Sequence, residues 1–478
     1  MPRQPTLIYD RGTLILHPPP RGKAWIDFAT WDDRVEKFRI PAVDYAALVS
    51  ALKIDKISFQ DQAAKFDTLT ELQLSAPWAP YAHQEEALTA WKQSLNRGVV
   101  VLPTAAGKTY LAHLAIAAIK KSTLIVVPTL DLLHQWSVQT QKILKGIRIG
   151  LLGGGSNDRD QADLLVATYH SAAIQAESLG NRYGLIVFDE CHHLPSSFFS
   201  GIAESSIAPY RLGLSATPER ADGSHQALAR LIGPVVYRRS TVELAKVAIA
   251  EFEVISIKVS LSELERRRYE QAIQTRNQFL RDCRLSLGSV DGWQRFVQAS
   301  ARSPAGRRAM QAHRLAKELA FGTEAKFTAL AELITKHIGD RMLIFTNDNR
   351  TVYQLSRMFL LPVITHQTPV KERQQILDRF RRGDYPIIGA SHVLNEGVDV
   401  PSAQVGIILS GTGSHREYIQ RLGRLLRKNP DHNRPAILYE LIALDTSEEK
   451  TAARRREINC PSPTLKAAEL PHPWQSDD

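Results

Sequence analysis

Two stretches of the chain alternate short apolar runs with longer segments of amphipathic periodicity. In the first stretch, the apolar runs are rich in aliphatic and β-branched residues and cover positions 99–102, 124–127, 164–167 and 185–188. Runs of this length are typical of strands buried on both faces, and the amphipathic segments between them are typical of crossover helices. The pattern therefore predicts a parallel sheet with flanking helices.

The second stretch repeats this pattern nearer the C-terminus. Its strand candidates cover positions 342–345, 386–389, 405–409 and 436–439. Two blocks of the same kind in one chain predict an α/β protein with two tandem domains, at residues 76–238 and 239–445.

Three segments depart from this alternation. Residues 1–75 carry ten basic and ten acidic side chains, with short apolar runs between turn signals, and predict a small, neutral α+β domain. Residues 262–320 have few β-branched runs and predict a helical segment ahead of the second alternating stretch. In residues 446–478, prolines stand among polar residues, which predicts a flexible tail.

Composition excludes several classes of protein. Hydrophobic residues make up 44% of the chain, which excludes disorder throughout, and the longest nearly apolar run, residues 110–119, is too short to cross a bilayer. We recognise no secretory signal and expect a cytoplasmic protein. Cys191, Cys283 and Cys460 form no C-x-x-C pair, so zinc ribbons and four-cysteine iron–sulfur clusters lack ligands.

The positive charge is concentrated in the predicted helical segment. The chain of 478 residues carries a net charge of +10, and residues 262–320 hold twelve lysines and arginines against six acidic residues. This surplus favours a polyanionic partner, although in a generic protein such a segment is more often a solvated helical arm. Trp293 and Phe296, three residues apart, are either a base-stacking pair or, as is commoner at helical spacing, core residues.

The segment from Leu102 to Thr109 has the form of a phosphate-binding loop. It reads Leu-Pro-Thr-Ala-Ala-Gly-Lys-Thr and lies between an apolar strand and a helical pattern. Backbone N–H groups at the start of that helix can face phosphate oxygens, Lys108 can reach the β- and γ-phosphates, and the Thr109 hydroxyl can hold Mg²⁺. Because the general pattern has glycine where Leu102 stands, an ordinary strand-to-helix turn is the alternative.

A pair of acidic residues follows a later strand of the same block. Asp189 and Glu190 come directly after the run at 185–188, at the carboxyl end of a strand, where α/β sheets place their ligands. Asp189 can hold Mg²⁺ through water, and Glu190 can position or deprotonate an attacking water. An isolated Asp-Glu pair is usually a solvated strand end, but this pair and the loop together predict a magnesium-dependent ATPase, and we expect no other metal.

The second block offers two arginines that would complete such a site. Arg424 and Arg427 are three residues apart and therefore lie on one face of a predicted helix. Guanidinium groups suit γ-phosphate oxygens and can stabilise the charge that develops as the phosphoryl bond breaks. A basic, solvated helix face is the alternative. Completion by the second block would couple hydrolysis to domain closure.

These motifs resemble those of superfamily two helicases, and of the XPB family of DNA helicases in particular. Residues 189–192, Asp-Glu-Cys-His, have the form of a D-E-x-H box, and Gln84 looks like an adenine-reading glutamine. Residues 215–217, 397–399 and 420–427 resemble motifs III, V and VI. The resemblance covers nearly the whole chain, to about residue 456, and is strongest to compact archaeal and bacterial members.

The resemblance implies an ATP-dependent 3′-to-5′ DNA helicase or translocase that acts in DNA repair, such as nucleotide excision repair, or in transcription. It implies two RecA-like domains, a damage-recognition-like domain at residues 1–75 and a thumb-like helical insertion at about 262–320. It also implies ATP and Mg²⁺ as cofactors, DNA as the partner, and a nuclease or repair and transcription factors as further partners. We expect a monomer.

The resemblance also assigns roles to the matching residues. As catalytic residues it implies Glu190, the base, with Asp189, Lys108, Arg424 and Arg427, and as Mg²⁺ ligands Thr109 and Asp189. The nucleotide-binding residues it implies are Gln84, Thr104, Ala105, Ala106, Gly107, Lys108, Thr109, Gly397 and Asp399. Those that couple hydrolysis to strand contact are His192, Ser215, Ala216, Thr217 and Gln420. Those that contact DNA are Thr129, Thr168, Arg220, Asp222, Arg266, Arg267, Arg268 and Arg276.

Three positions depart from the family pattern and keep alternatives open. Ala105 replaces the usual loop glycine, and the residues before Gln84 lack the usual Arg and Tyr. Ala221 replaces the acidic residue of an Arg-Glu-Asp element associated with DNA opening, which favours a double-strand translocase that unwinds little as an alternative. An RNA helicase and a non-catalytic scaffold that recruits a nuclease are further alternatives, although a scaffold would need degraded motifs.

Overall fold

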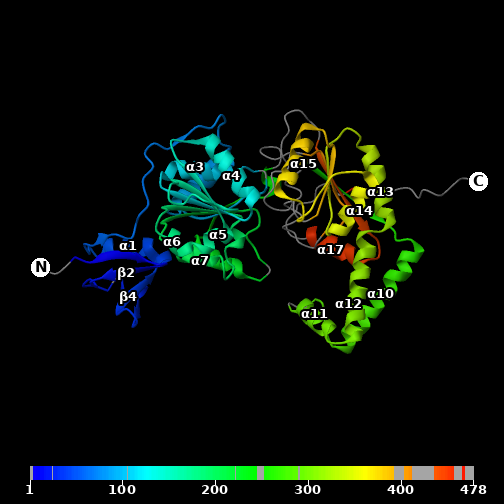
Figure 1. Cartoon of the computed structure of the whole chain (residues 1–478), viewed down its shortest axis with the longest axis horizontal. Helices are drawn as coiled ribbons and strands as arrows, with labels where there is room; N and C mark the ends of the chain where they lie inside the picture. The colour runs from blue at the N-terminus through cyan, green and yellow to red at the C-terminus, as the bar shows by residue number, and fades with distance from the viewer. Residues whose placement is uncertain are drawn as a thin grey trace, which may run out of the picture. The chain divides into compact units, whose positions relative to one another are not determined.

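The computed structural model describes residues 4–23, 25–104, 106–220, 222–244, 252–288, 291–391, 403–411, 435–456 and 466–468. The chain divides into two units, the first up to residue 248 and the second from residue 249 (Figure 1). The sequence pattern placed this change at residue 239. Helix α9, Thr241–Leu244, instead stays with the first unit.

The N-terminal part of the first unit is a small mixed sheet with a helix packed on it. The strands are β1 (Thr6–Asp10), β2 (Thr13–His17), β3 (Thr30–Asp32), β4 (Lys37–Pro41) and β5 (Gln60–Asp61), in the order β3-β4-β2-β1-β5. Helix α1, Tyr45–Ile54, buries Leu48 and Leu52 against Leu7, Leu14 and Ile40 of the sheet. The short helices here are η1 (Ile26–Phe28) and η2 (Ala42–Asp44).

A larger sheet forms the rest of the first unit, in the order β11-β10-β12-β8-β13-β14-β7-β15. Its strands are β7 (Arg97–Val101), β8 (Thr123–Val127), β10 (Ile149–Gly153), β11 (Ser156–Asn157), β12 (Leu164–Thr168), β13 (Leu185–Asp189), β14 (Tyr210–Ser215) and β15 (Val235–Arg238). All neighbouring pairs are parallel except β10 with β11. The predicted parallel sheet is therefore confirmed.

Helices cover both faces of this sheet (Figure 1). They are α2 (Ala82–Gln93), α3 (Lys108–Ile119), α4 (Leu130–Ile143), α5 (Tyr169–Ile174), α6 (Ala176–Leu179), α7 (Ser200–Glu204) and α8 (Leu228–Leu231), with the short helices η3 (Cys191–His193) and η4 (Ser224–Ala227). A two-stranded ribbon pairs β6, Gln73–Leu74, with β9, Leu144–Lys145. The fully buried strands explain the unbroken apolar runs in the sequence.

The second unit has a parallel sheet in the order β18-β19-β17-β20-β21-β16-β22. Its strands are β16 (Phe252–Val259), β17 (Met342–Phe345), β18 (Val363–Ile364), β19 (Ile387–Ala390), β20 (Val405–Ile408), β21 (Ala436–Ala443) and β22 (Lys466–Ala468). The helices beside it are α13 (Glu324–Lys336), α14 (Asn349–Phe359), α15 (Val370–Arg382) and α17 (Ser447–Arg456). The second predicted α/β domain is confirmed, with β16 as a strand that the apolar pattern did not single out.

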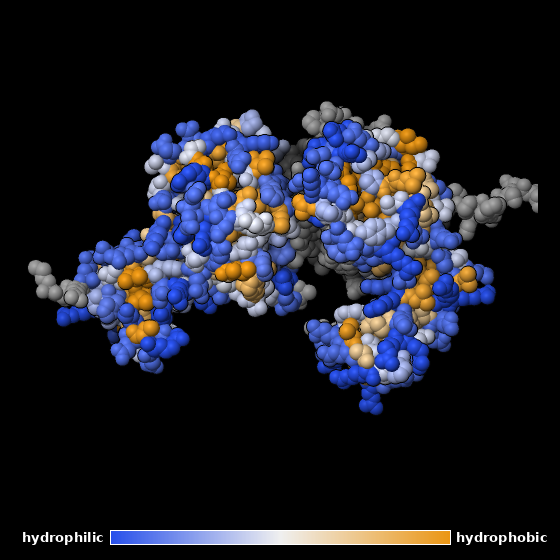
Figure 2. All heavy atoms as spheres, viewed as in Figure 1, coloured by the Kyte–Doolittle hydropathy of each residue, from blue (hydrophilic) through white to orange (hydrophobic). Residues whose placement is uncertain are grey.

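Three helices form an arm on the second unit, across the predicted insertion. They are α10 (Glu263–Asp282), α11 (Gly292–Ala301) and α12 (Pro304–Phe321). The start of α10 packs on the end of α12 through Tyr269, Ala272, Ala316 and Ala320, so these two helices are antiparallel. A capping box of Ser262 and Glu265 begins α10. Figure 2 shows a mainly hydrophilic arm with apolar residues gathered at a few places.

The C-terminal prediction is wrong in its first part. A flexible tail was expected from residue 446, but the structure places helix α17 at Ser447–Arg456 and buries Glu448 completely. The polar composition of α17 hides this role, because its buried contact is an ion pair rather than an apolar stripe. Among the described residues, no helix is long and apolar enough to span a membrane.

The N-terminal sheet docks on the larger sheet domain through a tight backbone contact at Gly180. The Tyr9 hydroxyl lies 2.9 Å from the carbonyl oxygen of Glu177 and 2.8 Å from that of Ser205. The side-chain amide nitrogen of Asn181 donates a hydrogen bond to the carbonyl oxygen of Ala63 at 3.0 Å. Gly180 lies beneath the Tyr9 ring, and a Cβ atom there would stand 2.0 Å from the Tyr9 hydroxyl oxygen and 2.1 Å from the Ser205 carbonyl oxygen.

We expect Gly180→Ala to destabilise the first unit by about 1–3 kcal/mol, because the methyl group cannot fit without moving Tyr9 and the Ser205 backbone. The free energy of unfolding in urea measures this effect. Gly201→Ala is the matched control: it lies in helix α7 with no atom within 4 Å of the new Cβ, so its stability should be unchanged or slightly raised. Equal stability of both variants would contradict this account of docking.

Candidate active site

The carboxyl edge of the first large sheet collects the predicted motifs. Strands β13, β14 and β7 are neighbours and run parallel, so Asp189, Ser215 and the loop after Val101 end at the same edge. The loop begins where the Leu102 amide donates to the Ser215 carbonyl oxygen at 3.1 Å. Parallel α/β sheets bind ligands at this edge, and three motifs that lie far apart in sequence meet there.

The predicted phosphate-binding loop passes directly into helix α3. Gly107 precedes the helix with a positive φ of 78°, a conformation that glycine adopts without steric cost. The Lys108 ammonium group donates hydrogen bonds back to the carbonyl oxygens of Leu102 at 3.1 Å and Pro103 at 3.4 Å. The lysine therefore lies over the loop, and Thr109 follows it within the first turn of α3. Helix N-termini with free N–H groups of this kind favour phosphate.

Gln84 supports this loop from behind. Its side chain is buried and accepts a hydrogen bond from the Tyr81 amide at 2.9 Å, which forms a capping box at the start of α2. Its amide nitrogen donates to the Gly107 carbonyl oxygen at 3.1 Å, and His83 contacts the Ala106 carbonyl oxygen at 2.9 Å. The sequence predicted that Gln84 binds adenine, whereas these contacts tie α2 to the phosphate loop.

Asp189 is held by a tryptophan that the sequence did not single out. The indole N–H of Trp136, on α4, donates to Asp189 Oδ2 at 2.8 Å, and the Glu190 amide donates to Oδ1 at 3.1 Å. Burial raises the pKa of Asp189 to about 6, with a further rise from the Glu190 charge, whereas Trp136 and Lys108 lower it. Trp136 is fully buried, so its helical spacing alone predicts a core residue, and only the contact reveals the second role.

Glu190 is presented by an unusual backbone conformation. Its φ of 46° is left-handed, and the residue precedes the short helix η3. Its carboxylate lies 3.4 Å from His192 Nδ1, and the same nitrogen lies 3.3 Å from the Ser215 hydroxyl. The Thr217 amide donates to that hydroxyl at 3.2 Å. The structure thus brings together the predicted coupling residues His192, Ser215 and Thr217, with Ala216 between the last two.

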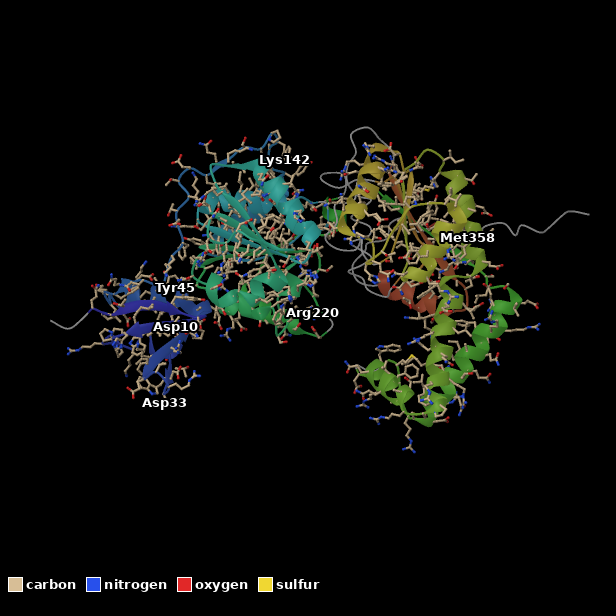
Figure 3. All side chains as sticks on the ribbon, viewed as in Figure 1. Asp10, Asp33, Tyr45, Lys142, Arg220 and Met358 are labelled. Atoms are coloured by element: carbon tan, nitrogen blue, oxygen red, sulfur yellow. The ribbon has the colours of Figure 1, made fainter. Side chains whose placement is uncertain are left out.

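The Arg220–Asp222 element joins this group on its other side. Arg220, labelled in Figure 3, lies in the first unit. It donates to the His192 carbonyl oxygen at 3.2 Å and pairs with the Asp222 carboxylate at 2.7 Å. The Arg220 guanidinium and Ser224 hold the pKa of Asp222 well below its usual range. Both predicted DNA-contacting side chains are therefore already engaged within the protein.

Two further residues predicted to contact DNA, Thr129 and Thr168, already make hydrogen bonds within the protein. Thr129 and Thr168 cap helices α4 and α5 at the same sheet edge, where their hydroxyls accept from backbone amides at 3.3 and 3.2 Å. Their side chains are thus engaged within the protein.

Ion pairs compensate part of the predicted basic surface of α10. Arg266 lies 3.2 Å from Asp445, and Arg267 lies 3.3 Å from Glu263. Arg268 is exposed, and the half-buried Arg276 donates to the side-chain oxygen of Asn277 at 2.8 Å. Two of these four arginines are thus neutralised by acidic partners, so most of the net positive charge of the arm comes from its other lysines and arginines.

Several predicted site residues lie outside the described residues. They are Ala105, Gly397, Asp399, Gln420, Arg424 and Arg427, and Ala221, which departs from the family pattern, also lies outside the described residues. Thr104, Ala106, Gly107, Lys108 and Thr109 lie in the described part of the phosphate loop and its helix. In the described part of the chain, no cluster of three or more His, Cys, Asp or Glu side chains could hold a metal ion.

A buried histidine behind Trp136 is expected to make stability depend on pH. His113, on α3, packs edge-on against the Trp136 ring at 5.5 Å and contacts the Thr140 hydroxyl at 3.0 Å. Burial lowers the pKa of His113 to about 4, below the value of about 6.5 expected in the unfolded chain. Because the unfolded state then binds the proton more tightly, stability present above pH 6.5 is lost as the pH falls toward 4.

We expect this loss to reach about 3 kcal/mol near pH 4, measured as the free energy of unfolding of the full chain at a series of pH values. His113→Gln, which keeps a polar group for Thr140, should remove the corresponding part of the pH dependence. His134→Gln, at an exposed position on α4, is the control and should leave the profile unchanged. Superimposable profiles for wild type and His113→Gln would show that His113 is not the titrating group.

Family models match three parts of the chain. Residues 7–63 match the "Xeroderma pigmentosum group B helicase damage recognition domain", and residues 78–220 match "Type III restriction enzyme, res subunit". Residues 325–429 match the "Helicase conserved C-terminal domain". The three matches follow the order of the N-terminal sheet and the two larger sheets.

Relatives and solved structures agree with these matches. The "DNA 3'-5' translocase XPB2" of Sulfurisphaera tokodaii is 40% identical over 78% of this chain and 84% of its own length. The "DNA 3'-5' helicase XPB" of Mycobacterium tuberculosis is 27% identical over 94% of this chain and 72% of its own length. The crystal structure of the Pyrococcus furiosus Hef helicase domain covers 78% of this chain with a TM-score of 0.51 at 18% identity, and shows the fold alone.

The two parallel-sheet domains, the motif-bearing sheet edge and the helicase family models define a superfamily two helicase, an ATP-hydrolysing enzyme. Its RecA-like domains are those predicted from the sequence. Within this class the chain belongs to the XPB family, as the damage-recognition match and the 40% identity to a family member show.

Proposed function

We propose that this protein is a 3′-to-5′ DNA helicase or translocase that couples the hydrolysis of Mg-ATP to the unwinding or remodelling of DNA. The observation that carries the proposal is the sheet edge where Lys108, Asp189 and Glu190 meet, in a chain whose named relatives act on DNA. A basic loop lysine, a buried carboxylate and an adjacent second carboxylate are the groups that phosphoryl transfer to water requires.

The residues present fit Mg²⁺ and ATP. Asp189 offers a buried carboxylate, and Thr109 offers a hydroxyl in the first turn of α3. Mg²⁺, when bound, neutralises charge on the β- and γ-phosphates. Trp136 holds one Asp189 oxygen, which orients the carboxylate, and Gln84 holds the loop carbonyl at Gly107. We propose that Arg424 and Arg427 meet the γ-phosphate.

The chain's own residues supply the chemical step. Lys108 exchanges the carbonyl oxygens of Leu102 and Pro103 for phosphate oxygens, since an ammonium group binds an anion more strongly than a neutral carbonyl. Glu190 Oε2 receives the proton of the attacking water. His192 contacts both the Glu190 carboxylate and the Ser215 hydroxyl. A change in the charge of that carboxylate during hydrolysis therefore acts on motif III through His192.

We also propose that the protein works inside the cell as a monomer on DNA, in repair or in transcription, with a nuclease or repair and transcription factors as partners. The damage-recognition match and the relatives named as transcription and repair factor subunits support this setting.

The test is the rate of ATP hydrolysis by the full chain with single-stranded, duplex, forked and lesion-bearing DNA, each at two salt concentrations. We expect DNA to stimulate hydrolysis, with less stimulation at high salt because phosphate contacts release counterions. The same lengths of RNA are the control and should stimulate less. The absence of stimulation by any DNA would overturn the proposal, and the absence of hydrolysis altogether would favour a non-catalytic scaffold.

A double-strand translocase that unwinds little is the second candidate. It is favoured by the pairing of Arg220 with Asp222, on either side of the position where Ala221 replaces an acidic residue, and by the hydrogen bond from Arg220 to the His192 carbonyl oxygen. Strand displacement compared with triplex displacement separates the two functions. Triplex displacement without strand displacement would favour the translocase.

A further inference from the structure

Helix α11 at the end of the arm presents one aromatic side chain and buries the other. Phe296 is fully buried against Phe279, whereas Trp293 is 49% exposed. The Trp293 ring lies 5.8 Å from the Phe296 ring and 5.2 Å from the His313 ring, between centroids. Core packing thus holds the indole on one side while half of its surface faces solvent, next to the exposed Val297 one turn later.

The surroundings of this ring are positively charged. Lys317, Arg276 and Arg314 lie near His313 and, together with the larger effect of burial, lower its pKa to about 4. These three cations have no acidic partner among the residues that the structure describes. The nearby acids are already engaged, since Asp291 pairs with Arg295 and Glu318 pairs with Arg350.

An exposed aromatic face near cations that have no acidic partner in the described part of the chain has a specific chemistry. Proteins bind single-stranded nucleic acids with aromatic rings that stack on bases and with positive charges that follow the phosphates. A duplex conceals the faces of its bases within the stack, so such a ring can use its face only on an unpaired base. A protein partner is disfavoured because the apolar part is one ring and one valine, whereas the charge is large.

We propose that Trp293 is a stacking platform for an unpaired base, with Arg314 and Lys317 binding the phosphates beside that base. This inference deepens the proposed function and rests on it, because it gives the arm a preference for single-stranded DNA. Arg276 is half-buried, donates to Asn277, and acts electrostatically on His313, the ring against which Trp293 packs. Neither the family matches nor the named relatives assign this site.

The test is the binding of the full chain to fluorescent DNA, read by anisotropy on a thymidine oligonucleotide, the same strand with abasic sites, and a blunt duplex. We expect Trp293→Ala to weaken binding to the thymidine strand about 10-fold and Trp293→Phe to restore most of it, while duplex binding stays within about 2-fold. Abasic DNA should bind wild type and Trp293→Ala alike. Trp31→Ala, an equally exposed tryptophan of the N-terminal sheet, is the matched control and should leave strand binding unchanged.

The proposed phosphate contacts of Arg314 and Lys317 are tested by the salt dependence of DNA binding. Arg314→Gln combined with Lys317→Gln should reduce the slope of log binding constant against log salt by about 1.4 on the single strand. Trp293→Ala, which removes no charge, should leave that slope unchanged.

The outcomes separate this inference from the proposed function. DNA-stimulated hydrolysis together with unchanged strand binding by Trp293→Ala would overturn the platform alone, and so would an equal loss on normal and abasic strands. Base-dependent binding that requires Trp293 in a protein without DNA-stimulated hydrolysis would keep the platform and reject the proposed function. Wild-type protein that binds no oligonucleotide would reject both.

Discussion

Glu190→Gln is expected to lower DNA-stimulated ATP turnover at least about 100-fold while ATP binding changes little. Glutamine has nearly the same shape as glutamate but cannot accept the proton of the attacking water. Glu190 directly follows Asp189 in the chain. Its carboxylate lies 3.4 Å from His192 Nδ1, at the same sheet edge as Lys108. Steady-state hydrolysis and equilibrium binding of a labelled nucleotide measure the two quantities separately.

Two variants make this prediction specific. Glu204→Gln changes an exposed glutamate on α7 in the same unit and should leave hydrolysis unchanged. Asp189→Asn should instead weaken the dependence on Mg²⁺, because it alters the proposed metal ligand that Trp136 orients. Full turnover by Glu190→Gln would remove Glu190 from the role of base and leave the phosphate loop assignment intact.

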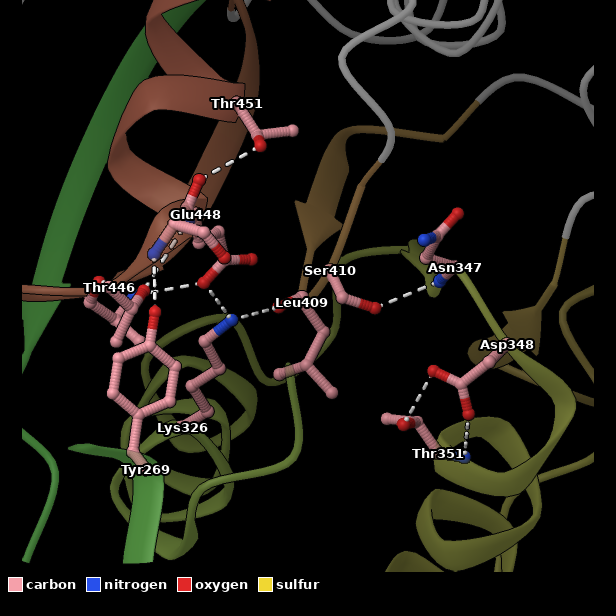
Figure 4. A network of polar contacts seen from close by, with 12 residues as sticks. Tyr269, Lys326, Asn347, Asp348, Thr351, Leu409, Ser410, Thr446, Glu448 and Thr451 are labelled. Carbon is pink, nitrogen blue, oxygen red and sulfur yellow. Dashed lines mark hydrogen bonds and ion pairs between the residues drawn. The ribbon is translucent and has the colours of Figure 1, made fainter. Parts of the chain in front are cut away.

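Glu448→Ala is expected to destabilise the second unit by about 3–5 kcal/mol, because it removes the carboxylate that pairs with the buried Lys326 ammonium. Lys326 and Glu448 have no exposed side-chain surface, and their charged atoms lie 2.6 Å apart. The ammonium also donates to the Leu409 carbonyl oxygen at 2.7 Å, and the Ala443 amide donates to the carboxylate at 3.0 Å (Figure 4). The pair thus ties α13 and α17 to the ends of β20 and β21.

A double variant distinguishes the cost of breaking the Lys326–Glu448 ion pair from the cost of lost packing. Lys326→Met combined with Glu448→Leu replaces both charges by apolar groups of similar size, and such replacements are often neutral. We expect it to recover most of the stability that Glu448→Ala loses, as measured by urea unfolding. A loss below about 1 kcal/mol for Glu448→Ala, or a double variant that is no better, would contradict the assigned role.

The same contact network explains how the arm is attached. The Tyr269 hydroxyl of α10 accepts a hydrogen bond from the Ser447 amide at 2.8 Å, at the first residue of α17 (Figure 4). Arg266, also on α10, pairs with Asp445 just before α17. Helix α17 therefore holds the base of the arm, and the ion pair beneath it stabilises that attachment.

Much of the fold and part of the active site were predictable from the sequence. Buried parallel strands require unbroken apolar runs, and the loop after such a strand carries the ligand-binding residues. Lys108 and the Asp189–Glu190 pair could therefore be assigned to one sheet edge, because parallel strands end on the same side. The helical arm was predictable for a similar local reason, since its periodicity and its caps lie within its own sequence.

Other features depend on contacts between residues far apart in the chain, and only the tertiary structure decided them. Trp136 and Trp293 both occupy helices as aromatic residues, yet the first is buried against Asp189 and the second is half exposed. Helical spacing sets the face on which a side chain lies but not what covers that face. For the same reason the polar sequence of α17 predicted a tail, whereas the partner that buries Glu448 comes from α13, more than a hundred residues earlier. The sequence by itself predicted the sheets, the helical arm and the loop before α3. The packing of distant segments determined which carboxylate is oriented, which ion pair is buried and which tryptophan remains half exposed.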